Sequence, residues 1–80
     1  MSVRVLFLGP LRDLAGCEAM ELAAPLDWEG LRARLPPALA EAVAQPRVSV
    51  ACAGRVLSDR TALRASDGDE VALLPPVSGG

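Results

Sequence analysis

The strongest constraint on the fold is an apolar run near the end of the chain that two prolines terminate. Val71 to Leu74 are four consecutive apolar residues, which indicates a buried strand. Pro75 and Pro76 stop this strand, because proline lacks the N–H that a strand ladder needs and biases the preceding residue toward an extended conformation. We therefore predict a core strand with a stiff, extended segment leaving it.

The segment that follows has little side-chain bulk. Val77, Ser78, Gly79 and Gly80 end in two residues without a Cβ, which can thread a channel that any side chain would block. Residues 75–80 would span roughly 20 Å when extended. Most chain ends are frayed, but frayed ends are seldom joined to a core strand by two prolines. We interpret residues 75–80 as a functional, flexible tail on a domain of residues 1–74, with the terminal carboxylate of Gly80 as its reactive group.

Composition narrows the class of protein. Eighty residues make one small domain. The net charge is −2 and the only aromatic residues are Phe7 and Trp28, which argues against a nucleic-acid surface. No apolar run is long enough to span a membrane and no signal-peptide pattern opens the chain, so we expect a cytoplasmic protein without a membrane partner.

Several residue types are missing, and their absence limits the chemistry. The sequence contains no His, Lys or Tyr. This excludes Ser–His and Cys–His catalysis and Schiff-base chemistry within the chain, and we predict no metal site and no bound cofactor. Cys17 and Cys52 form no Cys-x-x-Cys motif, so we expect both to be reduced; Cys52 is interpreted as a strand residue, while Cys17 follows a predicted turn and is expected near the surface.

The order of the predicted elements indicates an α+β roll. Asp27 is a good N-cap for one main helix, in which Trp28, Leu31 and Leu35 share a face, and Pro36 ends it. The remaining elements are strands at 3–8, 18–23, 47–53, 56–57 and 70–74, short helical segments at 11–15 and 38–44, and a polar surface loop at 58–67 in which Asp59 caps a turn. These elements predict a mixed sheet packed on one main helix, but they leave the strand order open.

Alternation along the first and last strands predicts an exposed apolar surface. Arg4 shares a strand face with Leu6 and Leu8, and Glu70 shares one with Ala72 and Leu74. The charged members indicate that these faces point away from the helix, so the opposite faces should form the core. Exposed contiguous apolar surface on a small domain usually marks a partner site. The alternative is that both faces of these strands are buried, for which a chain this short offers little material.

The two ends of the chain resemble a known family. Residues 67–80, which run from Asp67-Gly68-Asp69-Glu70 to Ser78-Gly79-Gly80, are similar to the C-terminus of the small subunit of molybdopterin synthase, the MoaD family of ubiquitin-like sulfur carriers. The opening resembles that family as well, in residues 3–7, in Leu11-Arg12-Asp13 and in Gly16. The resemblance implies the β-grasp, ubiquitin-like fold with the first and last strands as parallel neighbours in the centre.

The resemblance also implies a reaction and a set of partners. An E1-like enzyme would use ATP to adenylate the Gly80 carboxylate, and a sulfur donor protein would convert it to a thiocarboxylate. The tail, Val77 to Gly80, would then enter the active site of the large molybdopterin synthase subunit and supply sulfur for the dithiolene of molybdopterin, in a heterotetramer. This chain would be the non-catalytic sulfur-donating subunit. Its expected interface residues are Leu6, Leu8, Leu74, Pro75 and Pro76.

Three alternatives remain open at this point. The chain could carry sulfur for thiamine or cysteine synthesis, with the same tail chemistry and another acceptor. It could be a ubiquitin-like modifier that joins Gly80 to lysines of other proteins, although without Lys it cannot extend chains on itself. It could also be a non-reactive binding module of the same fold.

Overall fold

A computed structural model describes residues 1–75 of the 80-residue chain. A five-stranded sheet has the order β2-β1-β7-β4-β5, and a second sheet consists of the short strands β3 and β6. The main-sheet strands are β1 (Ser2–Phe7), β2 (Ala19–Ala23), β4 (Ser49–Cys52), β5 (Arg55–Val56) and β7 (Glu70–Leu74). The remaining elements are α1 (Pro10–Ala15), β3 (Leu26–Asp27), α2 (Trp28–Arg34), α3 (Pro37–Val43), the 3₁₀ helix η1 (Arg60–Ala62) and β6 (Arg64–Ala65).

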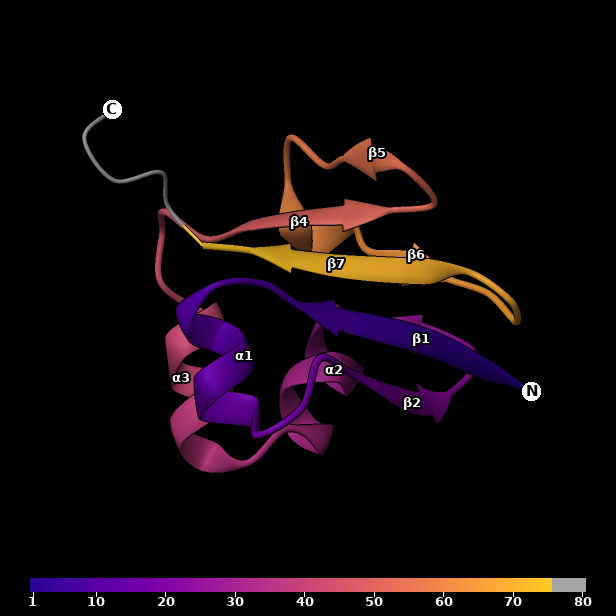
Figure 1. Cartoon of the computed structure of the whole chain (residues 1–80). Helices are drawn as coiled ribbons and strands as arrows, with labels where there is room; N and C mark the ends of the chain where they lie inside the picture. The colour runs from indigo at the N-terminus through magenta and orange to yellow at the C-terminus, as the bar shows by residue number, and fades with distance from the viewer. Residues whose placement is uncertain (76–80) are drawn as a thin grey trace.

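The first and last strands are parallel neighbours inside the sheet, as predicted. β1 pairs with β7 in parallel, with Arg4 opposite Glu70 and Phe7 opposite Leu73. β2 continues the sheet beyond β1, and β4 continues it beyond β7, both antiparallel. Figure 1 shows β1 and β7 running side by side and ending near α1. The β-grasp prediction is confirmed.

The core lies between the sheet and the helices. Val3, Val5 and Phe7 of β1, and Val71 and Leu73 of β7, are all at most 1% exposed. They pack with buried side chains of α2, α3 and the η1–β6 segment, among them Leu31, Leu39 and Leu63. Every second residue of the central strands is therefore in the core, which is the period that one buried sheet face requires.

Three short helices supply the helical layer. The predicted N-cap at Asp27 is confirmed, because its carboxylate accepts a 2.7 Å hydrogen bond from the Gly30 N–H. A Cβ on Gly30 would lie 2.8 Å from that same carboxylate oxygen, so the glycine leaves room for the cap. Pro36 and Pro37 separate α2 from α3, which makes two helices of seven residues each where the pattern favours one main helix and a shorter second one.

The segment 58–67 is more ordered than the predicted surface loop. Asp59 caps a turn as expected, accepting hydrogen bonds from the N–H and hydroxyl of Thr61, and these bonds lower the pKa of its carboxyl group. The segment then forms η1 and β6, and β6 pairs with β3. Leu63 and Ala65 are each 1% exposed, so the prediction of a loop is wrong here. Two-residue strands have too few positions to show an alternating pattern.

Within residues 1–75, no helix has the length and apolarity needed to span a membrane.

Candidate partner surface at the root of the tail

The segment that precedes residue 76 lies where the central strands of the main sheet end. Because β1 and β7 are parallel, their C-terminal ends lie side by side, and antiparallel β4 begins there, with Ser49 opposite Leu74. Figure 1 shows α1 and α3 next to each other beside these strand ends. The topology therefore brings three separate parts of the chain around Pro75.

Gly9 makes a close approach to Pro75 possible. Its backbone has φ 57° and ψ −135°, a combination that residues with a Cβ rarely adopt. A Cβ on Gly9 would lie 3.1 Å from Cγ of Pro75. Gly9 thus lies in the turn between β1 and α1 and leaves space for the ring of the first tail residue.

The outward sheet face is more exposed than the core face, as the alternation predicted, but most of its predicted residues are only partly exposed. Leu6, Ala72 and Leu74 are half-buried, and Leu8, one residue beyond β1, is 43% exposed. The register places Ala72 next to Leu6 on one side and next to Ala51 of β4 on the other. We call Leu6, Leu8, Ala51, Ala72 and Leu74 the outer apolar face.

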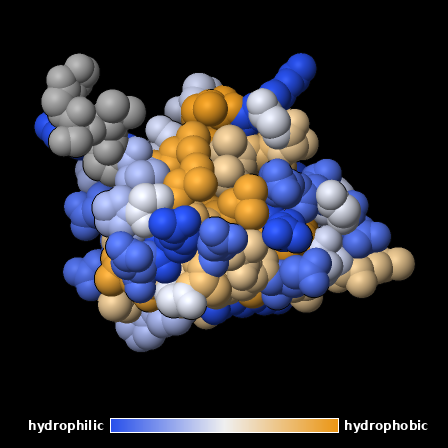
Figure 2. Space-filling model, in the orientation of Figure 1, coloured by the Kyte–Doolittle hydropathy of each residue, from blue (hydrophilic) through white to orange (hydrophobic). Residues whose placement is uncertain are grey.

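Figure 2 shows apolar surface in the middle of the face in view, over the strands of the main sheet. Val56 pairs with Ala51 of β4 and is 65% exposed. It extends the apolar surface to the outer strand β5. At the other end of the central strands Arg4 lies between Glu21 and Glu70, so charged residues border the face there. The contribution of β4 and β5 was not predicted, although Ser49 and Ala51 share the outward face of β4 and alternate with buried Val50.

The predicted interface residues Leu6, Leu8, Leu74 and Pro75 therefore lie near one another, on two neighbouring strands and the residues that follow them. Their role in binding a partner stays a prediction. Pro76 and the tail residues Val77, Ser78, Gly79 and Gly80 lie outside the described part of the chain.

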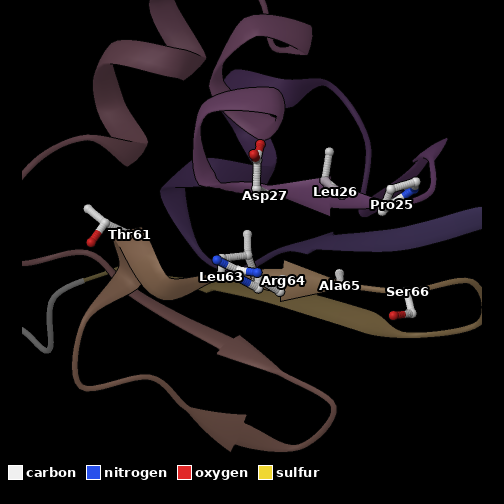
Figure 3. Close-up of a pocket in the computed structure, with 8 residues that line it drawn as sticks. All are labelled: Pro25, Leu26, Asp27, Thr61, Leu63, Arg64, Ala65 and Ser66. Carbon is white, nitrogen blue, oxygen red and sulfur yellow. The ribbon is translucent and has the colours of Figure 1, made fainter.

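The described residues form several surface hollows, and one of them reaches the tail root. This hollow, of about 480 Å³, lies between α1 and the α3–β4 connection, and we call it the tail-root groove. Its lining includes Pro10, Leu11, Pro46, Arg47, Val48 and Pro75. Another, of about 430 Å³, lies along β3 and β6 and is shown in Figure 3. In that view Asp27 points toward α2, where its carboxylate caps the helix.

The two cysteines contribute no clustered site in residues 1–75. Both thiols are free and half-buried, and both side chains pack against the core, so Cys17 is less exposed than the sequence suggested. Burial raises the pKa of the Cys52 thiol, and the negative charge of Asp69 raises it further. A thiol with a raised pKa is a weaker nucleophile at neutral pH than an ordinary cysteine.

Comparison with models of protein families gives one match that covers nearly the whole chain. The model of the ThiS family matches residues 5–80, which is nearly the whole chain and includes the Gly-Gly end. The chain belongs to the ThiS family. This confirms the resemblance to the ubiquitin-like sulfur carriers of the ThiS/MoaD group. A search of curated proteins found no match.

Several solved structures share the fold over all or nearly all of the chain. The structure titled as the protein–protein complex of subunits 1 and 2 of molybdopterin-converting factor from Helicobacter pylori matches with 31% identity and a TM-score of 0.70, covering 100% of both chains. SAMP1, the small archaeal modifier protein 1 from Methanosarcina acetivorans, matches with 23% identity and a TM-score of 0.80, covering 99% of this chain and 96% of that one. SAMP1 from Haloferax volcanii matches with 21% identity and a TM-score of 0.76, again over 100% of both chains. The two SAMP1 likenesses concern the fold.

Proposed function

We propose that this ThiS-family protein carries sulfur on the carboxylate of Gly80 and delivers it to the dithiolene of molybdopterin. The observation that supports this most strongly is the family match, which extends through residue 80 and so includes both tail glycines. The arrangement at the tail root is also suitable, because the partly exposed outer apolar face lies beside Pro75 and can bind a partner while the tail enters that partner's active site.

The chemistry assigns activation to partners. A carboxylate is a poor acyl donor, so an E1-like enzyme transfers AMP from ATP to Gly80, which forms a mixed anhydride and releases pyrophosphate. Hydrosulfide supplied by a donor protein then attacks the acyl carbon. The new carbon–sulfur bond replaces the bond to AMP, AMP leaves, and a thiocarboxylate remains on Gly80. The chain itself binds no cofactor in this scheme, and ATP belongs to the activating enzyme. Its own contribution is a tail without bulky side chains at the tip.

The choice of molybdopterin rests on the Helicobacter pylori structure, whose sequence identity to this chain is higher than that of the two SAMP1 structures. The 31% identical structure is a complex of subunits 1 and 2 of molybdopterin-converting factor, which supports a large-subunit partner for this chain. In that assembly two small and two large subunits would form a heterotetramer, and the thiocarboxylate of Gly80 would give its sulfur to the pterin precursor in the active site of the large subunit.

A second candidate is protein modification, after which the small archaeal modifier protein that shares this fold is named. In this case the activated Gly80 carboxylate would form an amide with a lysine of another protein. The absence of Lys in this sequence is compatible with single attachment and prevents chains from growing on the modifier itself. A sulfur carrier for thiamine or cysteine synthesis would have the same tail and a different acceptor.

Complementation separates these possibilities. A strain that lacks its molybdopterin synthase small subunit is supplied with the wild-type chain or with a variant lacking Gly80, together with the matching large subunit. We expect the wild-type chain to restore activity of a molybdenum enzyme and the shortened chain to fail. Restoration by the shortened chain would contradict the carrier function. Failure of both, with lysine-linked adducts of the wild-type chain on other proteins, would favour the modifier.

A further inference from the structure

The tail-root groove is adjacent to the start of the tail. Pro75 is part of its lining and is also the last residue that the structure describes. The opposite side of the lining comes from the α3–β4 connection and from the start of α1, and both lie near the end of β7. Any ligand of this groove therefore lies next to the point from which residues 76–80 continue.

The groove has an apolar lining with one cationic side chain. Leu11 and Val48 are buried and contribute to the core below it, while Pro10 and Pro46 are exposed at its rim. Arg47 is the charged residue of the lining, and among residues 1–75 it takes part in no ion pair. This combination suits a short apolar segment that ends in a carboxylate.

We propose that the tail-root groove is a docking site for residues 76–80 of the same chain when no partner holds them. Five extended residues reach about 17 Å, which is enough to cross a groove that begins at Pro75. Pro76 and Val77 would supply apolar atoms to the lining, the glycines would follow its surface closely, and the Gly80 carboxylate would bind the Arg47 guanidinium. Direct attachment gives the tail an effective concentration in the millimolar range, which a separate peptide lacks.

Docking would hold the tail in the tail-root groove while the protein is free of partners. A partner that binds the outer apolar face would then compete with the groove for the tail, because the same five residues cannot lie on Arg47 and enter a partner's active site. The inference concerns the tail on which the proposed function depends, but it requires no thiocarboxylate.

Cross-linking on the full-length chain tests the docking directly. The sequence has no Lys, so Arg47→Lys introduces the only lysine amine. A water-soluble carbodiimide activates carboxylates, and an amine within reach then forms an amide with loss of water. We expect a peptide joining residues 47 and 80, with a yield per chain that is independent of protein concentration. The matched control is Arg55→Lys, which places a lysine on exposed β5 outside the groove.

Three cross-linking results would overturn the proposal. The first is the absence of the 47–80 peptide, and the second is an equal yield of the 55–80 peptide in the control. The third is a yield that rises with protein concentration, since that assigns the groove to the tail of a second copy. Because the assay uses neither ATP nor a sulfur donor, loss of docking is distinguishable from loss of carrier chemistry.

Nuclear magnetic resonance gives an independent test without a new amine. Val77→Asp puts a charge on the segment proposed to contact apolar side chains. We expect the amide signals of Leu11 and Val48 to shift relative to wild type while those of Leu31, in the core of α2, stay in place. Unchanged signals for both groove residues would contradict docking.

Discussion

The guanidinium of Arg60 lies over the indole of Trp28, with its central carbon 4.9 Å from the ring centroid. The same guanidinium donates hydrogen bonds to backbone carbonyls at the end of α3 and in the turn after it, namely those of Val43, Ala44, Gln45 and Val48. The last carbonyls of a helix have no partner within the helix, so Arg60 supplies donors that they would otherwise lack. One side chain thus links η1, α2 and the α3–β4 connection.

Replacing Arg60 should therefore destabilise the domain. We expect Arg60→Ala to lower the free energy of unfolding by about 1–3 kcal/mol, because several hydrogen bonds and a cation–π contact are lost together. Arg60→Lys should recover only part of this, since an ammonium lacks the planar fork of donors. Urea unfolding followed by Trp28 fluorescence measures both. The control is Arg55→Ala, an exposed arginine on β5, which should change stability by less than about 0.5 kcal/mol. Equal effects of the two alanine variants would refute this role.

Gly9 should be intolerant of a side chain because of Pro75. We expect Gly9→Ala to destabilise the domain by about 1–3 kcal/mol, through backbone strain and through the 3.1 Å approach of the new Cβ to Cγ of Pro75. In a Pro75→Ala background that Cγ is absent, so the cost of Gly9→Ala should fall. Gly16 is a useful comparison, because its φ is 74° but no atom lies within 4 Å of its Cβ position. The Pro75→Ala change should leave the cost of Gly16→Ala unaltered, and a double-mutant cycle by thermal unfolding measures this.

Cys52 should react slowly with thiol reagents in the folded protein. Its pKa is raised by burial first and by Asp69 second, so less thiolate is present at a given pH than in the unfolded chain. In a Cys17→Ser background, disulfide-exchange reagents at pH 8 should modify the folded protein more slowly than the urea-unfolded protein. Asp69→Asn should accelerate the folded reaction by removing the negative charge. The sign for stability follows: the contribution of this group is present below the pKa of the unfolded thiol and is lost as pH rises through the folded value.

Leu74 should matter for partner binding more than for folding. Leu74→Glu places a charge on the half-buried outer apolar face, and we expect it to weaken binding to a large molybdopterin synthase subunit by at least about tenfold. Circular dichroism should show that the fold is retained. The matched control is Leu14→Glu on α1, because Leu14 is an exposed leucine away from the sheet. Calorimetry that gives the same affinity for wild type and Leu74→Glu would remove this face from the interface.

The sequence was informative where a local pattern decides the structure. Arg4 and Glu70 mark the outward faces of their strands by alternation alone, and Asp27 caps α2 through a bond to a residue three positions away. The sequence did not predict contacts between distant segments. The contacts of Arg60 with Trp28 and with the end of α3 depend on tertiary packing. The strands β3 and β6 are far apart in the sequence and have two residues each, which is too short to show an alternating pattern. The tail-root groove is a feature of the same kind, since three separate segments build it.

The most direct test of the proposed function is the intact mass of the untagged protein from cells that contain its activating enzyme. The carrier chemistry predicts a mass increase equal to the exchange of one oxygen for sulfur, localised by fragmentation to Gly80. Protein from cells without the activating enzyme should lack this increase. An unmodified Gly80 under the same conditions, in a protein that is fully folded, would contradict it.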